Sequence, residues 1–237
     1  MIINISDGYG ENNILYLQTA LGELLSRADC NVTSNFFGER AVLSINCPEQ
    51  YADIIKAEVA DKIAEIVAIS YKYDYFKNNV KVEGLSESEK ELLYASLIAA
   101  DLPDDKKYCF ERCALTSDFA IDGTFNFKLQ ALKRKWKEIA SYIPCGFISS
   151  QLKEFIKYLL ENKKKKSYID DGKVYDCHFR RLKRSELLGG EGLKITREIL
   201  LSNCGEIELI GKIPKDDEYY LKEFYGDRIT FSAGYFG

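Results

Sequence analysis

The apolar residues between positions 125 and 143 recur at alternating steps of four and three residues. This 3.5-residue spacing places them along one face of a helix. The seam consists of Phe125, Leu129, Leu132, Trp136, Ile139 and Ile143. A second seam follows a break at Pro144 and Gly146, and it consists of Ile148, Leu152, Phe155 and Leu159. Because the break is short, the pattern predicts two helices packed as an antiparallel hairpin.

This predicted hairpin lies at the centre of a helical region over residues 85–166. The region opens with Ser86 and Glu89, which have capping-box spacing ahead of an apolar run. Pro103 predicts the end of that first helix, because proline lacks the backbone N–H that a helix needs. A short further helix is expected after Asp104.

The residues before this region predict a small α/β unit over positions 1–84. The expected elements are a strand over 1–6, a helix over 12–28, strands over 31–37 and 40–46 with Gly38 at their turn, and one or two helices from Pro48 towards Gly84. Their order is β-α-β-β-α.

The last region, residues 167–237, predicts the order β-β-α-β-α-β. Asp171-Gly172 is a hairpin-turn signal between residues 168–169 and a strand over 173–184. A helix over 192–203, a strand over 207–213, a helix from Pro214 and a strand over 229–231 follow. The last three elements fit a parallel βαβ unit. The chain is therefore predicted to be α+β, with three regions that can also pack as one compact domain.

Composition limits the cellular compartment and the kinds of partner that we expect. The net charge of −4 argues weakly against a protein that mainly coats nucleic acid. The start of the chain has no signal-peptide pattern, and no window approaches the roughly 18 apolar residues that span a membrane. The seven cysteines are odd in number and scattered, as expected for reduced thiols. These features predict a cytoplasmic protein without a membrane partner.

The residues that most often perform catalysis form no recognisable set. His178 is the single histidine, so sites that need two are excluded. On the predicted strand, Cys177 and His178 would point to opposite faces and could not form a dyad. Cys109 and Cys113 do not complete a zinc site, and Cys145 is expected to be exposed in a turn. No catalytic residue, cofactor or metal is therefore predicted.

Two further features have structural explanations. The glycines of 189–192 precede a helix but do not match a phosphate-loop motif, so phosphate binding there is only an alternative. The aspartate pairs 104–105, 170–171 and 216–217 sit at predicted turns or helix starts, where capping explains them.

Clustered cations are the one sizeable charge feature. The candidate contacts for an anionic partner are Lys128, Lys133, Arg134, Lys135, Arg180, Arg181, Lys183 and Arg184. Such a partner could be nucleic acid, an acidic protein or a phosphorylated ligand. The alternative is that these residues are a solvated helix face and a solvated edge strand.

Residues 121–129, Ile-Asp-Gly-Thr-Phe-Asn-Phe-Lys-Leu, resemble the signature Ile-Glu-Gly-Phe-x-Asn-Phe-Arg-Leu of the YtxC family of sporulation proteins. Residues 152–160 resemble that family's next helix, and the segments around Leu200-Leu201, 206–213 and 224–229 resemble its tail. Thr124 and Lys128 depart from the signature, and residues 232–237 lack the tail cysteines of other members. The resemblance implies a cytoplasmic protein of a Gram-positive spore-former and assigns no catalytic residues.

Three hypotheses follow. The first is a non-enzymatic interaction protein linked to sporulation, with a protein partner. The second is a nucleic-acid or anion binder that uses the clustered cations. The third is an unrecognised enzyme that acts on a phosphorylated ligand near residues 189–192.

Overall fold

The computed structural model describes residues 1–9, 11–38, 40–113, 117–190 and 192–232. It confirms the predicted α+β class. The chain divides into two compact units: unit one holds residues 1–72 and 103–138, and unit two holds residues 73–102 and 139–237. This division differs from the three consecutive regions expected at 1–84, 85–166 and 167–237. The chain leaves unit one after Lys72 and returns to it at Pro103.

Unit one contains a four-stranded sheet with the order β2-β3-β1-β4. Its strands are β1 (Ile2–Asp7), β2 (Asn31–Phe37), β3 (Arg40–Asn46) and β4 (Asp118–Ala120). β3 runs antiparallel to β1 and β2, whereas β4 runs parallel to β1. The predicted hairpin is confirmed, with Gly38 in the turn at φ 61°. β4 was not expected, because three residues carry too little of a pattern.

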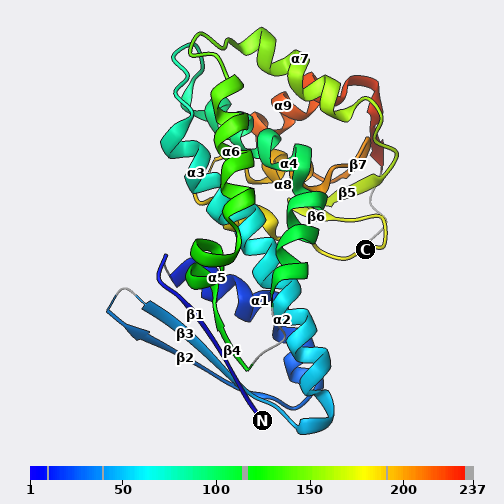
Figure 1. Cartoon of the computed structure of the whole chain (residues 1–237). Coiled ribbons are helices and arrows are strands. Elements are labelled where there is room, and N and C mark those ends of the chain that lie inside the picture. The colour runs from blue at the N-terminus through cyan, green and yellow to red at the C-terminus, as the bar shows by residue number, and fades with distance from the viewer. Residues whose placement is uncertain (10, 39, 114–116, 191, 233–237) are drawn as a thin grey trace. The chain divides into compact units, whose positions relative to one another are not determined.

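The helices of unit one cover one side of this sheet. They begin with α1 (Glu11–Arg27), the short η1 (Glu49–Tyr51), α2 (Ala52–Ile66) and the π-helical η2 (Val67–Tyr71). Figure 1 shows α1 and α2 on the same side of the sheet, and α1 packs against β1, β3 and α2. The alternation of β1 buries Ile3 and Ile5 towards this helical layer.

A buried ion pair lies where the chain leaves unit one and returns to it. Lys72, the first residue of α3 (Lys72–Asn79), donates from Nζ to Oδ2 of Asp105 over 2.7 Å. Both side chains are essentially inaccessible to solvent. Lys135 donates to the other oxygen over 2.8 Å, and the indole of Trp136 donates to Oδ2 over 3.1 Å. Burial raises the pKa of Asp105, but Lys72 and the hydrogen bonds outweigh it, so the net pKa is lowered.

Asp105 lies inside a helix, so two predictions about this region were wrong. α4 (Glu87–Arg112) runs through Pro103 instead of ending there, and the separate helix expected after Asp104 is its second half. Asp105 is therefore an ion-pair partner and not a cap. The loss of one backbone hydrogen bond at Pro103 is offset by contacts on both sides of it, such as buried Leu102 and the Asp105 cluster. The capping box of Ser86 and Glu89 is confirmed at the start of α4.

The apolar seam over 125–143 is also interrupted. It is divided at Leu129 into α5 (Ile121–Lys128) and α6 (Gln130–Tyr142). The rings of Phe125 and Trp136 stack with their centroids 5.6 Å apart. Residues eleven apart in a straight helix would be separated by about 16 Å along its axis, so this contact requires the break.

Unit two contains a second four-stranded sheet, with the order β6-β5-β7-β8. Its strands are β5 (Lys166–Asp170), β6 (Lys173–Tyr175), β7 (Glu206–Ile210) and β8 (Ile229–Ser232). β5, β7 and β8 are parallel, whereas β6 is antiparallel to β5. The Asp171-Gly172 turn is confirmed, with φ values of 45° and 74°. The parallel βαβ unit at the end of the chain is confirmed as well.

Several helices belong to unit two. They include α7 (Ser149–Leu160), the short η3 (Arg184–Leu188), α8 (Lys194–Ser202), α9 (Lys215–Tyr225) and the short η4 (Gly226–Arg228). α7 packs against α9. The first nine residues of α6 belong to unit one and α7 belongs to unit two, so the predicted pairing of these two helices stays a prediction.

Side chains along β5 alternate between the two faces of the sheet. Ser167 and Ile169 are buried towards the helices of unit two. Lys166, Tyr168 and Asp170 therefore lie on the opposite face of the sheet. Within the described ranges, every helix of the chain is too short or too polar to cross a lipid bilayer.

The Lys72–Asp105 pair predicts a large effect of a small substitution. Asp105→Asn removes the carboxylate charge that faces Lys72 in this buried cluster, and breaking a buried pair in this way costs about 3–5 kcal/mol. Urea unfolding followed by circular dichroism should show a loss of this size.

The matched control is Arg27→Ala, which removes an exposed ion pair with Glu23. It should change the unfolding free energy very little. Equal behaviour of the two variants would show that the buried pair does not stabilise unit one.

Candidate anion-binding pocket

The segment after β6 forms a hydrogen-bonded turn around Asp176. Oδ1 of Asp176 accepts the backbone N–H groups of His178 and Arg180 over 2.8 and 2.9 Å. Its own N–H donates to the carbonyl of Arg180, and its carbonyl accepts the N–H of Phe179. Aspartate favours such turns because its side chain satisfies nearby backbone donors. The strand predicted over 173–184 therefore ends at Tyr175, and Asp176 fixes the direction of residues 177–180.

A pocket of about 300 Å³ lies between this turn and the start of β5. Its cationic lining residues are Lys165, Lys166, Arg180 and Arg184. Ser167 and Ser202 contribute hydroxyl groups, whose oxygens are 3.2 Å apart. The carboxylate of Asp176 lines the pocket as well, so four cations face one carboxylate. Cations that converge on a concave surface suit a phosphate or another oxyanion.

The charges of the pocket are only partly compensated. Lys166 pairs with Glu208 over 2.7 Å, and this hydrogen bond raises the pKa of Lys166. Arg184 donates to the carbonyl of Leu201 over 3.4 Å. Among the residues that the structure describes, the side chains of Lys165 and Arg180 have no carboxylate partner. The pocket therefore retains an attraction for anions.

Cys177 and His178 lie together at this pocket, which corrects the prediction that they could not meet. The sulfur of Cys177 is 3.3 Å from Nδ1 of His178. The prediction assumed a strand, in which consecutive side chains diverge, but these residues occupy the Asp176 turn. Both side chains are exposed, so water competes for the same contacts.

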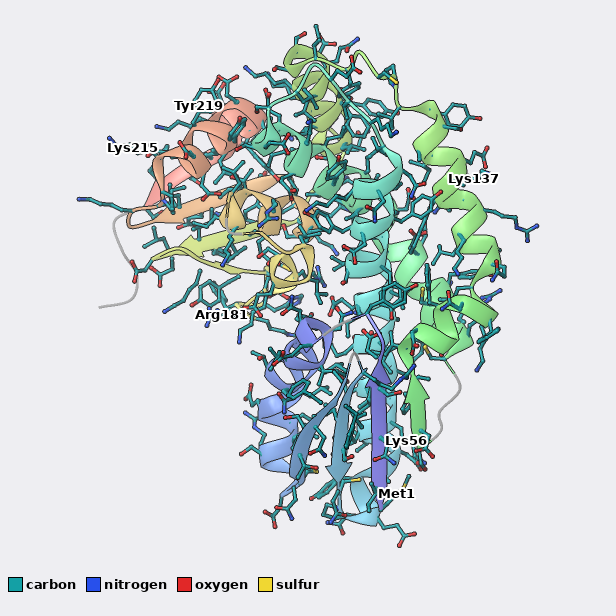
Figure 2. All side chains as sticks on the ribbon, turned by 90° about the vertical axis from the view of Figure 1, so that its left-hand side faces the viewer. Met1, Lys56, Lys137, Arg181, Lys215 and Tyr219 are labelled. Atoms are coloured by element: carbon teal, nitrogen blue, oxygen red, sulfur yellow. The ribbon has the colours of Figure 1, made fainter. Side chains whose placement is uncertain are left out.

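Only two of the four basic residues predicted as anion contacts in unit two line this pocket. Arg180 and Arg184 line the pocket, whereas Arg181 and Lys183 do not, and Arg181 is exposed to solvent (Figure 2). Sequence reasoning missed Lys165 and Lys166, because the run 163–166 was explained by the end of the preceding helix. α7 ends at Leu160, so the run instead leads into β5.

The basic residues predicted in unit one have mainly structural contacts. Lys135 belongs to the Asp105 cluster. Lys133 donates to Oδ1 of Asn126, and its Nζ lies 4.1 Å from the centroid of the Phe125 ring. Lys128 and Arg134 are exposed. Two of the four residues on this helical face therefore support the fold.

The glycine loop before α8 does not provide a phosphate site in the described residues; Glu191 lies outside them. The N–H of Thr196 donates to Oδ1 of Asp217 over 2.7 Å in a buried contact. Asp217 thus places a carboxylate at the helix start, where a phosphate would have to bind. The buried guanidinium of Arg197 donates to the carbonyls of Gly189 and Gly190 over 2.8 and 3.1 Å, which fixes the loop.

The cysteines differ mainly in access to solvent. Cys109 is buried, and burial raises the pKa of its thiol. Burial also raises the pKa of Cys113 to about 11. Cys145 is exposed, as predicted, and Cys177 is exposed as well. Across the described ranges, no group of three or more histidine, cysteine or acidic side chains is arranged to hold a metal ion.

Comparison of the chain with protein-family models, with curated proteins and with solved structures gives no match. The YtxC resemblance of residues 121–129 therefore remains a prediction from the sequence. In the structure these residues form α5 and the break at Leu129.

The difference in access predicts the order of thiol modification. Iodoacetamide added to the folded protein should alkylate Cys145 and Cys177 before the buried Cys47, Cys109 and Cys204. Peptide mass spectrometry over a time course measures the order. Modification of Cys109 or Cys204 as fast as Cys177 would contradict the burial described here.

Proposed function

We propose that this is a binding protein whose second unit recognises a phosphate or similar oxyanion group of its ligand. The site is the pocket between the Asp176 turn and the start of β5. The observation that carries the proposal is the convergence of four cationic side chains on one concave surface, where Lys165 and Arg180 have no carboxylate partner in the described chain.

The pocket combines two kinds of recognition. Guanidinium groups such as that of Arg180 bind oxyanions through planar, paired N–H donors, and lysines add point charge. The hydroxyls of Ser167 and Ser202 form a short chain at the edge of the pocket, in which Ser167 donates to the oxygen of Ser202. Ser202 also donates to the carbonyl of Ile199, and this contact keeps its hydroxyl at the end of α8.

The proposal combines the first two sequence hypotheses. The YtxC resemblance supports a cytoplasmic setting in a spore-forming bacterium. In that setting the ligand is a phosphorylated molecule or a partner that presents a phosphate group. The pocket, and not the helical face of unit one, is the place where we expect it to bind.

The first test uses Cys177 as an internal reporter. Inorganic phosphate bound in the pocket should slow alkylation of Cys177, because that thiol lines the pocket, and should leave exposed Cys145 unaffected. The protection should weaken as sodium chloride is added, because salt screens exposed charges. No protection of Cys177 by phosphate or pyrophosphate at low salt would refute the proposal.

The second test uses adjacent arginines. Arg180→Gln removes one charged donor from the pocket and should weaken pyrophosphate binding about tenfold or more, given the usual strength of hydrogen bonds to charged groups. Arg181→Gln removes the same charge one residue away, outside the lining. Isothermal titration calorimetry should show near-normal binding for that variant. Equal weakening in both would indicate general surface charge and not a site.

A further inference from the structure

A second, smaller cavity adjoins the anion pocket. It measures about 170 Å³ and is lined by Tyr168, Asp170, Tyr175, Phe179 and Ile210. Pockets for drug-sized ligands measure about 300–1,000 Å³, so this cavity suits one small group only. Three of its five lining residues are aromatic.

The two cavities share a border. Phe179 lines the small cavity, and the next residue, Arg180, lines the anion pocket. On β5, Nζ of Lys166 in the anion pocket lies 5.4 Å from the ring centroid of Tyr168 in the small cavity. One ligand can therefore occupy both.

Phe179 combines an unfavourable backbone conformation with an exposed aromatic ring. Its backbone φ of 59° falls in the left-handed region, which bulky residues rarely adopt. Its ring stacks on Tyr168 at a centroid distance of 4.6 Å, and yet 58% of the residue remains exposed. The Asp176 turn and the stack on Tyr168 hold Phe179 in place, but neither accounts for the ring surface that stays exposed. That exposed surface is available for a ligand ring to stack on.

The charges around the two cavities indicate which kind of ligand ring the aromatic cavity can hold. Aromatic rings beside a carboxylate could also accept a cation. The cations of the adjoining pocket, however, would repel a positively charged group. A neutral planar ring with an attached phosphate fits both cavities. The Asp170 carboxylate only accepts hydrogen bonds, so it favours a ring that presents an amino group.

We infer that the two cavities together bind a nucleotide unit, with the phosphate in the anion pocket and an amino-bearing base in the aromatic cavity. This inference rests on the proposed function and specifies its ligand. Aromatic stacking with a cationic contact to the phosphate is the usual way in which proteins hold single nucleotides of a strand. The source is either a free nucleotide or single-stranded nucleic acid.

The test compares ribose 5-phosphate with cytidine 5′-monophosphate by isothermal titration calorimetry on the whole protein. The nucleotide should bind about tenfold tighter, because only it carries a base. Phe179→Ala should remove this gain and leave ribose 5-phosphate binding unchanged. Tyr219→Ala, a control on α9 (Figure 2) that removes another exposed aromatic ring, should leave both affinities unchanged.

The outcomes separate the two proposals. Equal affinity for the sugar phosphate and the nucleotide, both lost in Arg180→Gln, overturns the nucleotide inference and leaves the anion pocket standing. Failure of both compounds to bind, or to protect Cys177, overturns the proposed function itself.

A last comparison distinguishes a free nucleotide from single-stranded nucleic acid as the ligand. A short cytidine oligonucleotide that binds much tighter than the monophosphate, with a steep salt dependence, indicates single-stranded nucleic acid. If the oligonucleotide binds no tighter per nucleotide than the monophosphate does, the ligand is a free nucleotide. Loss of the gain in Phe179→Ala supports the inference in either case, and its persistence overturns the inference.

Discussion

The buried ion pair between Lys72 and Asp105 is the contact on which the organisation of this chain depends. Lys72 is the last residue before the chain enters unit two, and Asp105 is the third residue after it returns. Removing two charges from water is expensive, and their attraction offsets this cost only with good geometry and further hydrogen bonds. Lys135 and Trp136 supply those bonds to the Asp105 carboxylate. The pair thus joins the two points at which the chain leaves unit one and returns to it.

The proposed site depends in the same way on one aspartate. Asp176 satisfies the backbone donors of His178 and Arg180, so the chain turns where a strand would otherwise continue. The turn brings Arg180 to the start of β5 and holds Phe179 over Tyr168. Cationic and aromatic groups therefore meet beside β5. Neither feature would form a site if residues 176–184 extended as a strand.

Local patterns predicted more of the fold than of the site. Alternation and helical spacing identified the main strands and helices of the first 79 residues, because β1, β3, α1 and α2 have buried residues at the expected spacing. The same rules failed at Pro103 and Leu129, where packing between distant residues outweighs local preference. Charge alone pointed to Arg180 and Arg184. Lys165 and Lys166 could not be assigned to the pocket, because the register of β5 and the end of α8 decide which side chains meet there.

We propose that the Asp176 turn and the start of β5 form the ligand site of unit two. The most direct measurement is a titration of ¹⁵N-labelled protein with inorganic phosphate, followed by amide chemical shifts. If phosphate binds in this pocket, the largest shifts occur at Cys177, His178, Arg180 and Ser167. Shifts concentrated at the start of α8, or none in the segment 176–184, would contradict it.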